Sequence, residues 1–276
     1  MFSVNTNAGA MVALQNLSKT NSALSQTQCR VNTGLAIATA KDNGGIYAIA
    51  QKMRSEVSAY NAVQQSLDRG VSTVDVALAA GEAISDLLVQ MKEKALAASD
   101  SSLDTQSRDS LNADFVALRN QITTIVSNAE FNGTNMLQTG GTAVVALANA
   151  DGANTITVAA EIMALGATGT VITLTGAQAI STVALATATV TAIETSLDNM
   201  GLALARLGTG AKALEIHNTF VTKLSDALEV GIGNLVDADL ARESAKLQSL
   251  QVKQQLGIQA LSIANSAPSV LLGLFR

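Results

Sequence analysis

The stretch LQNLSKTNSALSQTQCRVNTGL, residues 14–35, sets the first expectation about the fold. Along it, apolar residues recur at alternating steps of three and four, with polar residues at two of the steps. The positions are Leu14, Leu17, Asn21, Leu24, Gln28, Val31 and Leu35. So narrow an apolar stripe is typical of a helix in a coiled coil, not of one that packs on a broad globular core. We therefore expect this segment to be a helix that needs a partner helix.

Helical periodicity continues to about residue 128, with two interruptions. The adjacent glycines of KDNGG, residues 41–45, predict a break, because glycine weakens a helix. SDSSLDTQ, residues 99–106, predicts a turn followed by a helix start, with Asp104 or Ser102 available as the N-cap. Beyond it, Asn132-Gly133 is a turn dipeptide that ends the helical zone.

The centre of the chain, residues 139–186, changes character. Thr, Val, Ala and Gly dominate it, and two short β-branched runs, ANTITVAA at 153–160 and GTVITLTG at 169–176, are predicted to be strands of small hairpins. The least charged stretch, 162–193, is interrupted throughout by Thr and Gly, whereas a membrane span needs about 20 predominantly apolar residues. A β-hairpin region is therefore the better interpretation, and no membrane insertion is expected.

The last third returns to helix. One apolar face runs from Ile193 to Leu228, Gly231 and Gly233 predict a joint, and a final helix follows. The expected fold is mainly α: an elongated antiparallel helical rod or coiled coil formed by the N- and C-terminal segments, with a small central β-hairpin region. Isolated helices with thin seams are marginal in water. Both ends are thus predicted to bury their apolar residues against other copies of the chain.

Composition excludes several classes of function. The chain has 276 residues, and charged residues are 14%, against roughly 25% in ordinary soluble proteins. One Cys and one His exclude an internal disulfide framework and a His-rich metal site. The net charge of -5 without a basic block argues against nucleic acid as a partner.

The residues whose side chains could take part in catalysis or bind a metal do not predict a catalytic site, a metal site or a cofactor. His217 is expected to be a polar edge or surface residue. Asp237, Asp239 and Glu243 are not placed to share a metal, since residues two apart on a helix do not face each other. Asp237 is predicted to cap the last helix, with the others pairing with Arg242 or Lys246. Two glycines in LGTGAKA, residues 207–213, lack the preceding strand and the GK[ST] of a phosphate loop. The chain is therefore not expected to be an enzyme.

Three separated blocks resemble the bacterial flagellins. RVNTGLAIATAKDNGGIYAIAQKMRSE, residues 30–56, resembles their amino-terminal signature, and FNGTNML, residues 131–137, resembles the turn after their third helix. The carboxy-terminal signature is matched from residue 234 to 276, including the SIAN run and the final Leu-Phe-Arg. The short central zone is similar to that of compact alphaproteobacterial flagellins.

The resemblance implies a layered domain organisation. Residues 1–43 and 233–276 would be inner-tube helices, 44–138 and 187–232 would be shell helices, and 139–186 would be a short insert that faces outward. The residues implied to form the inner-tube assembly seam are Leu14, Leu17, Leu24, Val31, Leu35, Leu240, Leu247, Leu250, Leu261, Val270, Leu271, Leu274 and Phe275.

The implied function is that of a structural subunit of the extracellular flagellar filament. Its implied partners are further copies of the chain, sister flagellins, the flagellar cap, hook-junction proteins and an export chaperone of the type III apparatus. Two alternatives stay open at this point. A hook–filament junction protein shares the same end helices, and a type III secreted helical translocator would need a true hydrophobic hairpin.

Two further expectations follow from the residues and the resemblance. Cys29 is unusual in an exported flagellin and is predicted to be a small buried residue beside Val31, with an intersubunit disulfide as the alternative. The resemblance also makes hydroxyls of the central zone candidate O-glycosylation acceptors. These are Thr155, Thr157, Thr168, Thr170 and Thr173.

Overall fold

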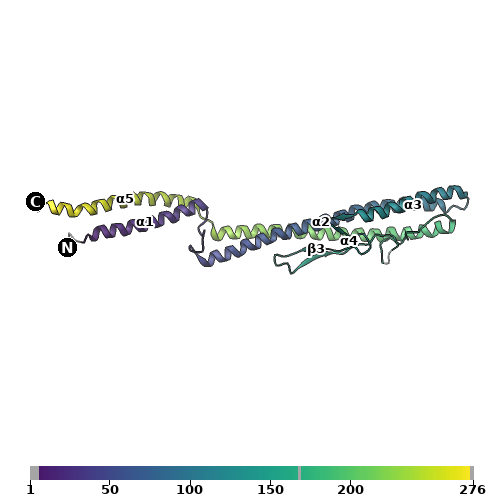
Figure 1. Ribbon diagram of the computed structural model, residues 1–276, viewed down its shortest axis with the longest axis horizontal. Helices are drawn as coiled ribbons and strands as arrows, with labels where there is room; N and C mark the ends of the chain where they lie inside the picture. The colour runs from purple at the N-terminus through teal and green to yellow at the C-terminus, as the bar shows by residue number, and fades with distance from the viewer. Residues whose placement is uncertain (1–5, 167–168, 274–276) are drawn as a thin grey trace. The chain divides into compact units, whose positions relative to one another are not determined.

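The chain is mainly α-helical, as the sequence predicted. The computed structural model describes residues 6–166 and 169–273, with side chains as far as residue 266 in the last helix. Its helices are α1 (Ala8–Thr33), α2 (Gly44–Ala98), α3 (Thr105–Asn128), α4 (Val183–Val236) and α5 (Leu240–Gly273) (Figure 1). The short strands β1 (Glu130–Phe131) and β2 (Thr134–Asn135) form one antiparallel hairpin, and β3 (Val144–Leu147) and β4 (Thr155–Val158) form another. Within the described residues, no helix combines the length and apolar character that crossing a bilayer requires.

The chain divides into two compact units. The terminal unit comprises Met1–Ser55 and Ala227–Arg276, and the middle unit comprises Glu56–Asp226. The divisions fall inside α2 and α4, so each of these helices contributes residues to both units.

The core of the middle unit follows heptad spacing. On α4 the fully or almost fully buried residues recur every seventh position: Ile193, Met200, Leu207, Leu214 and Val221. On α2 buried residues alternate by four and three along the helix: Val63, Leu67, Gly70, Val74, Ala77, Gly81, Ile84, Leu88, Met91 and Ala95. Phe115 and Ile122 of α3 complete this core. The contacts are therefore those of a coiled coil to which a third helix has been added.

Glycine notches seat the β3–β4 hairpin on the two long helices. A Cβ at Gly70 of α2 would lie 3.3 Å from Val144, and one at Gly210 of α4 would lie only 2.6 Å from Val158. Beside these notches, the Leu147 N–H donates to Ser66 Oγ (3.2 Å), and Nε2 of the half-buried His217 lies 2.7 Å from the carbonyl oxygen of Ala148. The hairpin is thus held by both helices.

The expectation of a strand at residues 169–176 is wrong. This segment has no regular secondary structure, although Ile172 and Leu174 are fully buried. Its polar groups are shared between α4 and the preceding segment. The Thr173 N–H donates to Ser196 Oγ of α4 (3.0 Å), whereas the Val171 N–H donates to the Ile162 carbonyl (2.8 Å) and the Leu174 carbonyl accepts from the Gly166 N–H (3.0 Å). The β-branched run packs on a helix instead of pairing with a strand. In the other predicted run, β4 forms and pairs with β3.

The turns near α3 match the sequence prediction. Asp104 is the N-cap of α3 and accepts a hydrogen bond from the Ser107 N–H at 3.3 Å. Asn132 and Gly133 have φ values of 49° and 81°, the left-handed pair that a tight two-residue hairpin of type I′ requires. Arg108, itself buried, donates to the carbonyl oxygens of Ala98, Asp100 and Leu103 at 2.9–3.0 Å. The guanidinium thereby satisfies the end of α2 and its turn.

Of the two predicted glycine breaks, the first is confirmed and the second is wrong. Residues 34–43 separate α1 from α2, and α2 begins at Gly44, where the Asn43 side chain accepts the Ile46 N–H at 3.2 Å. α4 continues through Gly231 and Gly233 and ends only at Val236. A glycine costs a long helix only about 1 kcal/mol, which tertiary contacts can outweigh. The positions of both breaks are instead set by pairing between the two connecting segments.

Candidate assembly surface

α1 and α5 lie side by side in opposite directions (Figure 1). Cross-helix contacts establish the register along their whole described length. They join Asn7 Nδ2 to the Ala264 carbonyl (2.6 Å), Gln254 Nε2 to Asn21 Oδ1 (2.8 Å) and Arg30 Nη1 to Glu243 Oε1 (3.0 Å). Asn7 is also the N-cap of α1, accepting the Ala10 N–H at 3.0 Å. The Asn7 side chain thus both caps α1 and links it to α5 by a hydrogen bond.

The seam between these helices is a heptad series on both sides. Its buried and half-buried positions on α1 are Ala13, Leu17, Thr20, Leu24, Thr27 and Val31. On α5 they are Leu247, Leu250, Gln254, Gly257, Leu261 and Ala264. At one point glycine faces leucine, because a Cβ at Gly257 would lie 3.2 Å from Leu17 Cδ1. The seam is close-packed but thin.

The structure places the predicted seam residues in different environments. Leu17, Leu24, Val31, Leu247, Leu250 and Leu261 lie on the α1–α5 seam. Leu14 is 57% exposed and Leu240 is 49% exposed, while Leu35 lies in the segment after α1. Val270 and Leu271 belong to α5, but their side chains, and the residues Leu274 and Phe275, lie outside the described part. Sequence reasoning missed Ala13, Thr20 and Thr27, because small and polar residues give no apolar signal.

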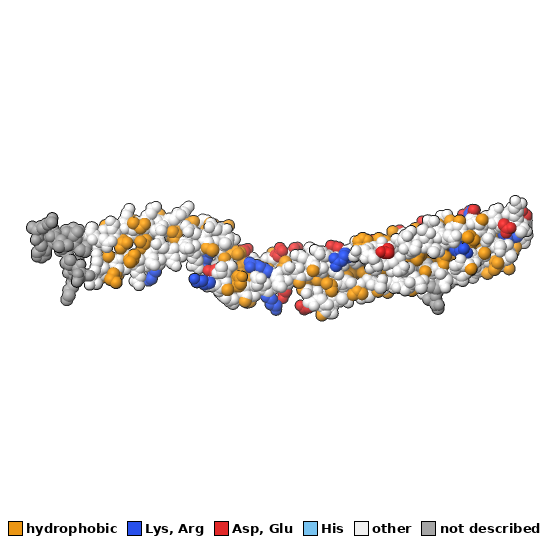
Figure 2. Space-filling view, in the orientation of Figure 1, with side chains coloured by type: hydrophobic (Ala, Val, Ile, Leu, Met, Phe, Trp, Pro, Cys, Tyr) orange, Lys and Arg blue, Asp and Glu red, His pale blue; other side chains and the backbone are white. Residues whose placement is uncertain are grey.

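A second set of apolar side chains on this pair points away from the seam. On α1 these are Met11, Val12 and Leu14, and on α5 they are Val252, Leu256, Ile258 and Ile263. All are more than half exposed, and Ile263 reaches 70%. Figure 2 shows hydrophobic side chains on the surface of this part of the molecule. Exposed apolar side chains are a feature of interaction sites, which makes this pair the candidate assembly surface.

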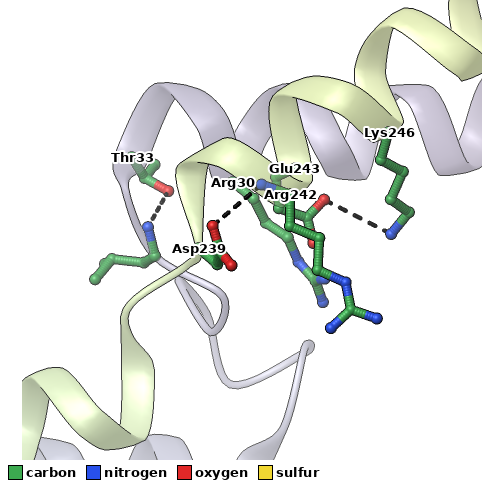
Figure 3. A network of polar contacts seen from close by, with 7 residues as sticks. Arg30, Thr33, Asp239, Arg242, Glu243 and Lys246 are labelled. Carbon is green, nitrogen blue, oxygen red and sulfur yellow. Dashed lines mark hydrogen bonds and ion pairs between the residues drawn. The ribbon is translucent and has the colours of Figure 1, made fainter.

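A charged cluster holds the α1–α5 pair where α5 begins. Arg30 lies within 3.0 Å of Glu243 Oε1, and Lys246 Nζ lies 3.6 Å from Glu243 Oε2 (Figure 3). Burial raises the pKa of Glu243, but the hydrogen bond from Arg30 and the positive charges of Lys246 and Arg30 outweigh it and lower the pKa below its usual value. Glu243 is therefore a carboxylate that holds two helices together.

The segments before α2 and after α4 pair with each other beside this cluster. Leu35 and Asp237 form an antiparallel bridge, flanked by hydrogen bonds from Ala36 N to the Val236 carbonyl (2.7 Å) and from Ala238 N to the Gly34 carbonyl (2.8 Å). The prediction that Asp237 caps the last helix is wrong. Because Asp237 is held in this bridge, Asp239 caps α5 and accepts the Arg242 N–H at 3.1 Å (Figure 3).

Cys29 does not occupy the predicted buried position. It is exposed, because the seam of α1 passes through Thr27 and Val31 and leaves position 29 on the outer side. No ionisable cluster suited to a metal occurs among the residues that the structure describes.

The candidate acceptor threonines differ in their accessibility. Thr155 and Thr157 are exposed on β4. Thr170 and Thr173 use their hydroxyls to donate to the carbonyls of Ile172 (2.7 Å) and Ala192 (2.8 Å). Thr168 lies outside the described residues.

Comparisons with known proteins agree on one family. The model for the bacterial flagellin N-terminal helical region matches residues 4–142, and that for the C-terminal helical region matches residues 190–275. The chain is 54% identical to flagellin FljM of Caulobacter vibrioides, over 99% of this chain and 98% of the relative. It is 38% identical to a flagellin of Brucella melitensis over the full length of both. A proposed flagellar hook-associated protein from Vibrio parahaemolyticus shares the fold, with a TM-score of 0.57 and 15% identity over 71% of this chain and 100% of that one.

Proposed function

The chain belongs to the bacterial flagellin family and is a structural subunit of the extracellular flagellar filament, and from this premise we propose that the α1–α5 pair is its main assembly surface. The observation that carries the proposal is the set of exposed apolar side chains that point away from the seam. Met11, Leu14, Leu256 and Ile263 are left largely uncovered within the subunit. Further copies of the chain would cover them.

The energetics of the pair support this assignment. Among the described residues of its seam, only Leu24, Thr27 and Leu250 are buried. Burial of apolar surface contributes about 25 cal/mol per Å², so a seam this thin stabilises two helices only weakly. Neighbouring copies would supply the remaining burial, as in a coiled coil with more than two strands.

A layered arrangement of the filament is part of the proposal. Residues 1–43 and 233–276 would form the inner tube, 44–138 and 187–232 the surrounding shell, and 139–186 the outer surface. The inner-tube residues would include those of the predicted seam, with Leu14 and Leu240 facing other copies because they are exposed in the single chain.

Of the partners proposed for this chain, further copies of the chain itself have the most direct support. We infer further that the cap, the hook-junction proteins and an export chaperone contact this chain, because the family resemblance implies them. Two basic residues of the middle unit have acidic partners in the same chain: Lys92 pairs with Glu194 (2.9 Å) and Arg206 with Glu161 (2.6 Å). They are therefore poor candidates for ion pairs between subunits.

Two finer assignments accompany the structural role. Membership of a structural-protein family favours a chain without catalytic activity. If sugars are attached in the central zone, Thr155 and Thr157 would be the acceptors, because their side chains are exposed whereas Thr170 and Thr173 use their hydroxyls within the fold. Intact-mass measurement of filaments tests this, and a bare chain mass rejects it.

The assembly proposal is tested by seeded polymerisation viewed by electron microscopy. The double variant Leu256→Ser/Ile263→Ser should leave monomer helicity unchanged and abolish filament growth. Removal of the residues before Asn16 and after Gln259, which shortens α1 and α5, should also abolish growth. Gln251→Ser, at an exposed polar position of α5, is the matched control and should polymerise normally. Normal filaments from the double variant would show that this face is not an assembly surface.

A further inference from the structure

Two Asn-Gly dipeptides occur in the chain, Asn43-Gly44 and Asn132-Gly133. In such a pair the backbone nitrogen of the glycine can attack the side-chain amide carbon of the asparagine, since glycine has no side chain to obstruct the approach. Whether a folded protein permits this attack depends on how firmly the asparagine and the glycine N–H are held.

Asn132 and Gly133 are weakly held. Both are exposed at the tip of the β1–β2 hairpin, and neither the Asn132 side chain nor the Gly133 N–H has a hydrogen-bond partner among the described residues. Asn132 is also the one non-glycine residue in the described ranges with positive φ, at 49°. Asparagine is one of the few residues besides glycine that adopts this left-handed conformation readily. The hairpin that imposes it has only two residues in each strand.

Asn43 is held more firmly at the start of a helix. Its Oδ1 accepts the Ile46 N–H at 3.2 Å, and its carbonyl accepts the Tyr47 N–H at 3.0 Å. The side chain must abandon the cap before its amide carbon can meet the Gly44 nitrogen. A helix N-cap contributes about 1 kcal/mol, so the same reaction is slower here.

We propose that Asn132 is a self-modification site that converts slowly to aspartate and isoaspartate while Asn43 stays intact. The Gly133 nitrogen bonds to Cγ of Asn132, and the side-chain amide leaves as ammonia with the proton from that nitrogen. The resulting succinimide is opened by water at either carbonyl. The net change is the loss of one ammonia and the gain of one water, so no oxidant, metal or enzyme is needed.

The carboxylate formed at position 132 would lie near the guanidinium of Arg69. Arg69 and Asn132 line the same groove, of about 370 Å³, together with Phe131 and Thr134. Among the described residues Arg69 makes no ion pair. Both products place a carboxylate at position 132, and Arg69 in the same groove would offset its negative charge.

The isoaspartate form should loosen the end of α3. It inserts one extra atom into the backbone of a two-residue turn whose register is fixed by pairing of Phe131 with Thr134. Next to it, Asn135 donates to the Val126 carbonyl (2.7 Å) and accepts from the N–H groups of Leu137 and Gln138. This buried amide depends on the hairpin for its position.

The test is ageing of the purified full-length chain in mildly alkaline buffer, with peptide mass mapping and isoaspartyl methyltransferase labelling. Under native conditions the peptide containing Asn132 should be modified at least about fivefold faster than that containing Asn43, the ratio expected from one helix cap. In urea the two rates should converge, because the fold no longer distinguishes them. Equal native rates, or faster reaction at Asn43, would overturn the proposal.

Two further measurements test the roles given to Arg69 and to Asn132. Asn132→Asp should show a positive thermodynamic coupling with Arg69 in a cycle that includes Arg69→Gln, and zero coupling would remove Arg69 from the proposal. Asn132-Gly133-Thr134 also fits the acceptor pattern for N-linked sugar. A carbohydrate mass on Asn132 in filaments from the source cells would overturn the assignment of this residue to deamidation.

Discussion

The two units of this molecule share the same heptad spacing but differ in how completely their apolar residues are buried. In the middle unit, large residues such as Leu67, Leu88 and Met200 are fully or almost fully buried, because α3 and the β3–β4 hairpin cover the long helices. In the terminal unit, α1 and α5 have only each other, and even Leu24 and Leu250 keep 8–9% exposure. Periodicity alone therefore does not distinguish a self-sufficient core from a surface that needs other copies.

The units also differ in charge. The middle unit contains eight basic and 17 acidic residues, for a net charge of -9, whereas the terminal unit contains nine and five, for +4. Repulsion between like-charged middle units opposes polymerisation and is screened by salt. The apolar face of the α1–α5 pair would have to overcome it.

The largest expected contrast between the units is in their response to core truncation. Phe115→Ala should lower the free energy of unfolding by about 3–5 kcal/mol, because it empties a fully buried site. Leu17→Ala, at a half-buried site of the thin seam, should cost roughly 1 kcal/mol. Urea unfolding of monomers, followed by circular dichroism, measures both. Equal losses would mean that the terminal pair has a core as complete as that of the middle unit.

Substitution of Arg108 tests whether its hydrogen bonds contribute to the stability of the middle unit. Arg108→Met keeps the apolar stem but leaves three carbonyl acceptors without their donor, for an expected loss of about 1.5–3 kcal/mol. Arg119→Met, which removes one hydrogen bond to the Gln178 carbonyl, is the control and should cost less. Urea unfolding measures both losses of stability. A larger loss of unfolding free energy for Arg119→Met than for Arg108→Met would contradict the role given to Arg108.

The glycine notch on α4 tests how closely the hairpin is seated. Gly210→Ala places a Cβ 2.6 Å from Val158, and overpacking of this kind costs about 1–3 kcal/mol. Gly201→Ala, on the same helix with nothing within 4 Å, should stabilise by about 0.5–1 kcal/mol. Opposite signs in thermal unfolding are expected. A stabilised Gly210→Ala protein would show that the hairpin can move away from α4.

The smallest effect is expected from acid on the α1–α5 pair. Because the folded pKa of Glu243 is lowered, its contribution is complete above the ordinary glutamate pKa of about 4.3 and is lost as the pH falls through the lowered value. The protection factors of α1 and α5 amides, which are corrected for the intrinsic pH dependence of hydrogen exchange, should therefore fall below about pH 4. Glu243→Gln should remove that pH dependence, whereas Glu229→Gln, at an exposed position of α4, should preserve it. An unchanged profile for Glu243→Gln would assign the acid response to other groups.

Much of the fold was accessible from the sequence. The α1 stripe, the Asp104 cap and the Asn132-Gly133 turn are local signals, and each rests on residue types whose backbone preference is strong. The α1–α5 seam within the chain was accessible in part. Leu17, Leu24 and Val31 are shared by the predicted and observed series, but the intermediate positions shift from 14, 21 and 28 to 13, 20 and 27. Small residues occupy the observed positions because the helices approach closely there.

Several features escaped local reasoning because distant groups decide them. The run at 169–176 has the β-branched residues of a strand, yet its hydrogen bonds are divided between Ser196 and Ala192 of α4 and the backbone of residues 162–166. Gly231 and Gly233 lie inside α4, since the helix ends where Val236 and Ala238 pair with the segment after α1. Cys29 is exposed because the seam turns position 29 outward.

By itself the sequence determined that this chain is mainly helical, which helices carry a narrow apolar stripe, and where capped turns separate them, because side-chain spacing and local backbone preference act over a few residues. Only the tertiary structure decided which of the two possible series on α1 faces α5, where α4 ends, and which apolar side chains remain uncovered. Those choices depend on contacts between residues more than 200 positions apart, such as Arg30 with Glu243. No local pattern encodes the shape of a partner that the chain supplies from its other end.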